Sequence, residues 1–175
     1  MKFRTVQFNL ILAAGGGLLL AGCASGGPRL ASVKHPTTFH FHLEVNRDGT
    51  DKNNPVTVNR SSPFQVNVLR DPFLIETHIM EAAVVDDSFG GFFIRVQLNK
   101  QGTWLLEQYT TANKGKRVAL FSIFEKTTRW LAAPVMDKRI ADGKFSFTPD
   151  ASREESDRIV LGLNELGKQV KKDEI

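Results

Sequence analysis

The chain has 175 residues, of which 41% are hydrophobic, and this predicts one domain with its own buried core. The chain contains 23 lysine and arginine residues and 19 aspartate and glutamate residues. Without Lys2 and Arg4, which belong to the leader described below, the excess of basic residues is only two. Such a small excess argues against a nucleic-acid partner. Because there is a single cysteine, no disulfide forms within the chain and the fold depends on its core.

Residues 1–22 have the features of a secretory signal peptide. Lys2 and Arg4 precede an apolar stretch over residues 10–21, which contains three glycines and is shorter than the ~20 residues that cross a bilayer. The stretch ends in Leu-Ala-Gly-Cys, which resembles the lipobox of bacterial lipoproteins. That resemblance implies cleavage before Cys23 and acylation of its sulfur, and two or three acyl chains anchor a protein stably. The alternative is an ordinary signal peptide that happens to contain a thiol.

The lipobox leads to an expected location. We expect a lipid-anchored protein of the cell envelope that faces the periplasm and contacts the membrane through acylated Cys23. Ala24 follows the cysteine, and in Gram-negative lipoproteins the absence of aspartate there favours the outer membrane over the inner one. Residues 23–38 are small and polar with two prolines, which predicts a flexible tether ahead of a single domain over residues 39–170.

Alternation of apolar and polar residues predicts most of the strands. These cover residues 39–46, 64–68, 82–85, 92–98, 118–124, 127–133 and 144–148. Residues 47–55 read as a polar loop, after which residues 56–58 are expected to return as a hairpin partner of the first strand. The segment 118–124 is apolar on both faces, and it is therefore expected at the centre of the sheet.

Two amphipathic helices complete the domain. Asn99 is the expected N-cap of the first, which ends at Lys114 and Gly115. Ser152 and Glu155 form a capping box at the start of the second, which has apolar residues at helical spacing as far as Val170 and precedes a charged tail over residues 171–175. A single helical turn is expected over residues 76–81. The predicted class is α+β, with an antiparallel sheet covered on one face by the two main helices.

Several segments resemble the head of the first periplasmic domain of SecD and SecDF, accessory subunits of bacterial protein export. They read LNKQG, TTANKGKRVAL, AAPVM and DGKFSF, and the resemblance covers residues 69–166. The matching positions are Ala82, Asp86, Leu98, Gly102, Thr111, Asn113, Gly115, Lys116, Arg117, Ala119, Ala133, Pro134, Val135, Ile140 and Gly143. A longer segment over residues 125–130 replaces the tight turn of the family. The resemblance implies a SecDF-head-like fold and contact with exported polypeptides or the export machinery.

His40 and His42 are the only candidates for a metal site. They share one face of a predicted strand with Glu44, and two histidines with a carboxylate can ligate zinc. The alternative, which we favour, is an ordinary solvent-facing strand surface, so neither a metal nor another cofactor is expected. No serine-nucleophile elbow or phosphate-binding loop occurs in the sequence, and we expect no enzyme activity.

The chain is rich in phenylalanine, and four aromatic residues are candidates for a peptide-contact surface. These are Phe89, Phe92, Phe93 and Trp130. An exposed aromatic cluster would bind other chains, as would an edge strand that accepts an extended peptide; packing in the core is the alternative. The expected function is a non-enzymatic, lipid-anchored binding module. A structural or assembly lipoprotein, with an unrelated envelope partner or with itself, is the second possibility.

Overall fold

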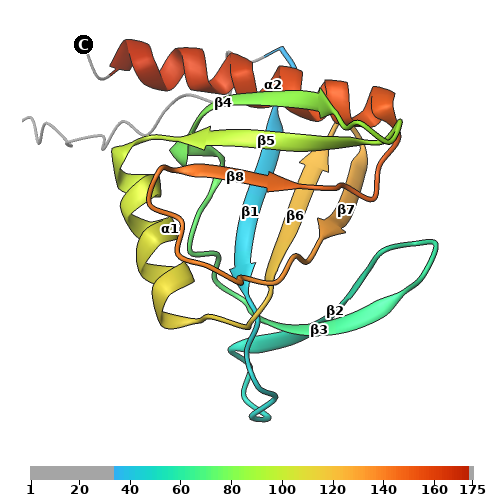
Figure 1. Cartoon of the computed structure of the whole chain (residues 1–175), viewed down its shortest axis with the longest axis vertical. Coiled ribbons are helices and arrows are strands. Elements are labelled where there is room, and N and C mark those ends of the chain that lie inside the picture. The colour runs from blue at the N-terminus through green and yellow to red at the C-terminus, as the bar shows by residue number, and fades with distance from the viewer. Residues whose placement is uncertain (1–33, 174–175) are drawn as a thin grey trace, which may run out of the picture.

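The computed structural model describes residues 34–173 (Figure 1). The elements in order are β1 (Thr37–Leu43), β2 (Asn53–Val58), β3 (Phe64–Leu69), η2 (Glu76–His78), β4 (Ile79–Asp86), β5 (Phe92–Leu98), α1 (Lys100–Ala112), β6 (Val118–Phe124), β7 (Thr127–Ala132), β8 (Lys144–Phe147) and α2 (Arg153–Asp173). The predicted signal peptide, Cys23 and the tether up to residue 33 lie outside the described residues. Among the described residues, no helix is long and apolar enough to span a membrane.

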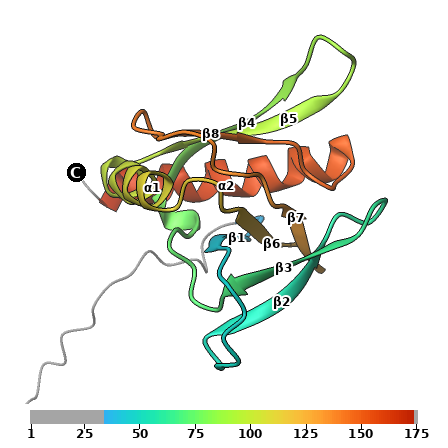
Figure 2. The same cartoon turned by 60° about the horizontal axis from the view of Figure 1, so that its bottom comes forward.

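Two three-stranded antiparallel sheets face each other, one with the order β1-β6-β7 and the other β4-β5-β8. Figure 2 shows them as successive layers, with the β2–β3 hairpin as a third layer outside the first sheet. Aromatic rings join the inner faces: Phe39 of β1 lies 5.8 Å from Phe147 of β8, and Phe41 lies 5.4 Å from Phe145, between ring centroids. The predicted α+β class with antiparallel pairing and two helices is confirmed, although two facing sheets replace the single sheet.

The expected hairpin between residues 39–46 and 56–58 is wrong. β1 pairs instead with β6, about 80 residues further along, and β2 pairs with β3 in the register Val56↔Val66. β6 is the central strand of its sheet, as predicted, and it is apolar on both faces. Its inner face meets the other sheet, so its outer face needs separate cover. The β2–β3 hairpin provides that cover through a second apolar cluster of Val58, Val66, Val68, Ala119 and Ala133.

The caps predicted for both helices are present. The side-chain oxygen of Asn99 accepts a hydrogen bond from the Gly102 amide at 2.8 Å. At the start of α2, the Ser152 amide donates to the Glu155 carboxylate at 2.8 Å and the Glu155 amide donates to the Ser152 hydroxyl at 3.2 Å, which is a capping box. α2 continues to Asp173, so the predicted tail begins inside the helix.

The sequence predicts that both helices cover one face of a sheet, and this prediction is wrong. α2 runs along β4, whereas α1 lies beyond the end of β5 (Figure 1). Each sheet already covers the inner face of the other, so the helices close the sides of the sandwich instead. The predicted helical turn over residues 76–81 is also shorter: Ile79 starts β4, because its side chain is buried and it pairs with Leu98.

α2 seals the outer edge of β4 through Asn164. Its side-chain oxygen accepts from the Ala82 amide at 2.8 Å, and its side-chain nitrogen donates to the Ala82 carbonyl at 2.9 Å. Two glycines allow α2 to lie close to neighbouring strands, Gly162 to β1 and Gly167 to β4. A Cβ on Gly162 would lie 2.1 Å from the Thr37 hydroxyl, and a Cβ on Gly167 would lie 2.6 Å from the Met80 carbonyl oxygen.

Candidate functional site

A groove follows the outer edge of β8. It consists of two cavities of about 600 Å³ and 500 Å³, which share Pro134 as a wall residue. The first cavity is bordered by residues 144–146 and the second by residues 147–150, so together they accompany the whole strand and the segment after it.

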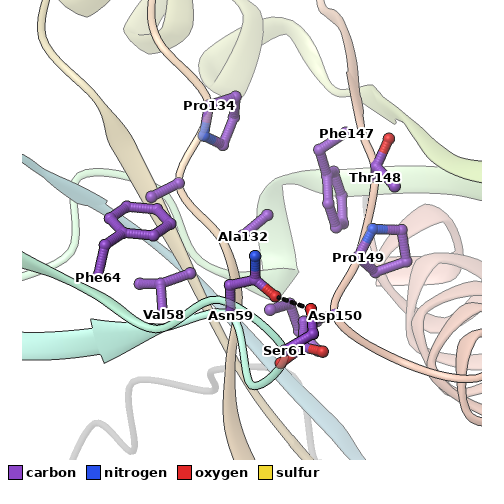
Figure 3. A pocket seen from close by; sticks show the side chains of 12 residues that line it. Val58, Asn59, Ser61, Phe64, Ala132, Pro134, Phe147, Thr148, Pro149 and Asp150 are labelled. Carbon is purple, nitrogen blue, oxygen red and sulfur yellow. Dashed lines mark hydrogen bonds between the residues drawn. The ribbon is translucent and has the colours of Figure 1, made fainter.

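The opposite wall of the groove comes from two distant parts of the chain. Residues 131–141 form the wall of the first cavity and part of the second, and the β2–β3 hairpin completes the second (Figure 3). Figure 3 shows Phe64 of the hairpin and Phe147 of β8 on opposite sides of the second cavity. The Val135 side chain remains 46% exposed and Phe64 37% exposed. Each cavity therefore carries one large apolar side chain that is accessible from solvent.

Asp150 holds the walls of the second cavity together. Its carboxylate accepts from the backbone amide of Arg60 at 2.8 Å and from Arg60 Nε at 3.2 Å. Its own amide donates to the Leu131 carbonyl at 2.7 Å. These contacts join the hairpin, β7 and the segment after β8, so the groove is preformed in the fold.

A charged pair beside Asp150 fixes the start of α2. Arg129 donates two hydrogen bonds of 2.9 Å each to the two carboxylate oxygens of Glu155. Mainly through these bonds, Arg129 lowers the pKa of Glu155 to about 2. Glu155 therefore stays ionised at all ordinary pH values, and its attachment to β7 does not depend on pH there.

The groove offers apolar surface and backbone groups. The charged residues that line the first cavity balance each other: two are acidic, Asp137 and Asp142, and two are basic, Lys138 and Lys144. Arg139 also lines this cavity, and its charge is paired with that of Glu107. Neither histidine nor cysteine lines either cavity of this described part of the chain. The arrangement is suited to binding an extended chain by burial and hydrogen bonding.

His40 and His42 lie side by side on the outer face of the β1-β6-β7 sheet, with ring centroids 5.8 Å apart. The predicted third partner, Glu44, is not with them: β1 ends at Leu43, so the alternation no longer applies, and the Glu44 carboxylate accepts from the Arg117 amide at 2.7 Å. Glu76 takes its place, with its carboxylate 3.6 Å from His40 Nε2. Within residues 34–173, no three side chains form a group that could hold a metal ion.

Burial governs the protonation of this histidine pair. It lowers the pKa of both imidazoles, and neither Glu76 beside His40 nor the Leu69 carbonyl beside His42 fully offsets this effect. His42 Nδ1 lies 2.9 Å from that carbonyl oxygen. The pair therefore packs as neutral rings between the sheet and the end of β3.

The four aromatic residues predicted as a contact surface do not form one cluster. Phe89 is 97% exposed at the tip of the β4–β5 hairpin. Phe92 and Phe93 are consecutive residues of β5, so their side chains point to opposite faces of the sheet. Trp130 belongs to the other sheet, where its ring lies 5.1 Å from that of His42.

The sequence did not indicate a binding role for the residues of the groove. The alternation of Phe145 and Phe147 with Lys144 and Ser146 predicts a half-buried strand, and β8 is observed there. Nothing in that pattern indicates whether the strand has one neighbour or two. Val135 belongs to the AAPVM segment that resembles the SecDF head, but the resemblance assigns it no role, and only its place after a proline suggests an irregular, exposed segment.

Comparison with known proteins identifies the relatives of this fold. The family model of the SecDF P1 head subdomain matches residues 47–165, which confirms the resemblance and extends it before residue 69. A SecDF structure described as a membrane component that enhances protein export is similar at a TM-score of 0.54 and 19% identity, over 78% of this chain and 64% of that one.

A second SecDF structure, in the super-membrane-facing form, is similar at a TM-score of 0.51 and 20% identity, over 78% of this chain and 19% of that one. The chain thus spans less than two thirds of the length of either SecDF chain. No curated protein matches it.

Proposed function

We propose, because the chain belongs to the SecDF P1 head subdomain family, that its domain is a non-enzymatic binding module of protein export that holds exported polypeptides in the groove beside β8. The observation that carries this proposal is the groove itself: it follows a strand edge from end to end and has accessible apolar side chains on its far wall. A polypeptide in transit has not yet buried its apolar side chains. A groove that offers apolar contacts without a net charge of its own fits such a ligand.

The anchor belongs to the same proposal. Acylation of Cys23 attaches the chain to the outer membrane on its periplasmic side, and the tether before β1 lets the domain reach passing chains. Support comes from the Leu-Ala-Gly-Cys motif and from the alanine that follows it.

Binding can be measured with the full chain purified in detergent and a labelled, permanently unfolded protein, such as reduced and carboxymethylated α-lactalbumin. Fluorescence anisotropy should show binding of this unfolded chain and none of native α-lactalbumin. Val135→Glu should weaken binding about tenfold, because it replaces an apolar contact worth about 1.5 kcal/mol with a charge that resists burial.

Leu161→Glu is the matched control. Leu161 is 47% exposed and Val135 46%, but Leu161 lies on α2 and outside the groove. Equal binding of native and unfolded α-lactalbumin, or equal losses in the two variants, would contradict the proposal.

A further inference from the structure

We infer that the groove takes its polypeptide as an added β-strand, hydrogen-bonded through the backbone to Ser146 and Thr148 on the outer edge of β8. This inference rests on the proposed function and specifies the ligand: an extended segment with apolar side chains at alternate positions.

The backbone groups of this edge are directed into the groove. The Leu98 amide donates to the Gly143 carbonyl at 2.9 Å, which sets the ladder between β5 and β8. In an antiparallel ladder every second residue turns its N–H and C=O away from the partner strand. Residues 145 and 147 therefore bond to β5, whereas residues 144, 146 and 148 point outward.

Only the first of these outward donors is occupied. The Lys144 amide donates to the Asp142 carboxylate at 3.0 Å. The backbone groups of Ser146 and Thr148 have no hydrogen-bond partner elsewhere in residues 34–173. Both residues have exposed side chains and border the groove, so an incoming strand can reach these groups without displacing part of the protein.

Four other edge strands in the described part of the chain are at least partly covered or lack a donor. Asn164 covers β4, and Leu74 covers β1 by accepting from the Phe41 amide at 2.9 Å. On β7, the Leu131 carbonyl is already bonded to Asp150. β2 carries Pro55, which has no N–H to donate and is tolerated only on edges. On the outer edge of β8, by contrast, the unpaired backbone groups of Ser146 and Thr148 adjoin both cavities of the groove.

The cavities determine which side chains the added strand carries. A strand next to β8 would lie about 4.8 Å away and rise about 3.3 Å per residue, with alternate side chains facing the interior. One inward side chain would enter the 600 Å³ cavity beside Val135, and another would enter the 500 Å³ cavity beside Phe64. The intervening side chains would face solvent beside Ser146. Two apolar residues at alternate positions, with polar ones between them, are therefore the preferred ligand.

Peptides test the hydrogen bonds without altering the protein. The probe is a short, soluble peptide of alternating valine and threonine, bound to the full chain in detergent. One version carries backbone N-methyl groups on its valines and another on its threonines. Only one of these sets of N–H groups can face β8, so one version should bind about tenfold more weakly than the other. Equal affinities would overturn strand addition.

Protein variants test the same bonds from the other side. Ser146→Pro removes an outward N–H without breaking the ladder to β5, whereas Ser146→Ala keeps that N–H. We expect Ser146→Pro to bind about tenfold more weakly and Ser146→Ala to match wild type, with both variants folded by circular dichroism. If Ser146→Pro fails to fold, the comparison of the two N-methylated peptides still tests strand addition.

The outcomes separate the two proposals. If wild type binds the unfolded protein while the methylated peptides and a folded proline variant show no difference, strand addition is wrong and the groove binds by side chains alone. If wild type binds neither peptide nor unfolded protein, the proposed function itself fails. A dimer that Ser146→Pro dissociates would make a second copy of the chain the occupant, and this too would overturn the inference.

Discussion

Replacing Asn164 with alanine should open the outer edge of β4 and destabilise the domain by about 2–4 kcal/mol. The change removes both hydrogen bonds between the side-chain amide and the Ala82 backbone, and Ala82 is only 4% exposed. Two ordinary hydrogen bonds contribute about 1 kcal/mol each, and a backbone group that is left buried without a partner costs about 1–3 kcal/mol. The lower figure applies if water reaches the edge, and the higher one if it stays dry.

Urea unfolding followed by far-UV circular dichroism measures this loss, provided that the slope of the transition is unchanged. Hydrogen exchange should also show faster exchange of the Ala82 amide. Lys168→Ala on the exposed side of the same helix is the control and should unfold close to wild type. If the free energy of unfolding of Asn164→Ala lies within about 0.5 kcal/mol of wild type, the Asn164 side chain does not hold this edge.

Three further predictions concern pH, packing and the anchor. Burial lowers the pKa of His40 and His42, so the folded state disfavours their charged forms. The urea midpoint of unfolding should therefore be highest above about pH 6.5 and should fall as the pH drops below that value. A midpoint that does not change with pH would contradict this prediction. Gly162→Ala should cost at least about 2 kcal/mol in the same assay, because its Cβ would lie 2.1 Å from the Thr37 hydroxyl, and a neutral effect would count against the packing of α2. Cys23→Ala should release a folded protein from membranes, and sedimentation with membranes after a high-salt wash would rule out the lipid anchor.

The sequence predicts local structure well where side chains determine it. The segment from β5 through α1 to β6 follows directly from alternation, the Asn99 cap and a strand apolar on both faces. The capping box of α2 is equally readable. In each case the residues that determine the structure are close together in the chain.

The pairing of distant strands could not be predicted in this way. β1 finds β6 through backbone hydrogen bonds, which have the same chemistry at every residue, and nothing in its alternation distinguishes that partner from β2. For the same reason the sequence did not predict the groove, because its walls come from distant segments: the β2–β3 hairpin, residues 131–141 and the edge of β8. For the histidine pair, the sequence suggested Glu44, whereas tertiary contact brings Glu76.

The most direct test of polypeptide binding in the groove is site-specific photo-crosslinking in cells that make the full chain, with a photoreactive residue at Val135 in one strain and at Leu161 in the other. The two sites are 46% and 47% exposed, so general accessibility is matched. We expect the photoreactive residue at Val135 to capture newly exported polypeptides and the one at Leu161 not to. Equal capture at both sites, or capture of exported chains at Leu161 alone, would contradict binding in the groove beside β8.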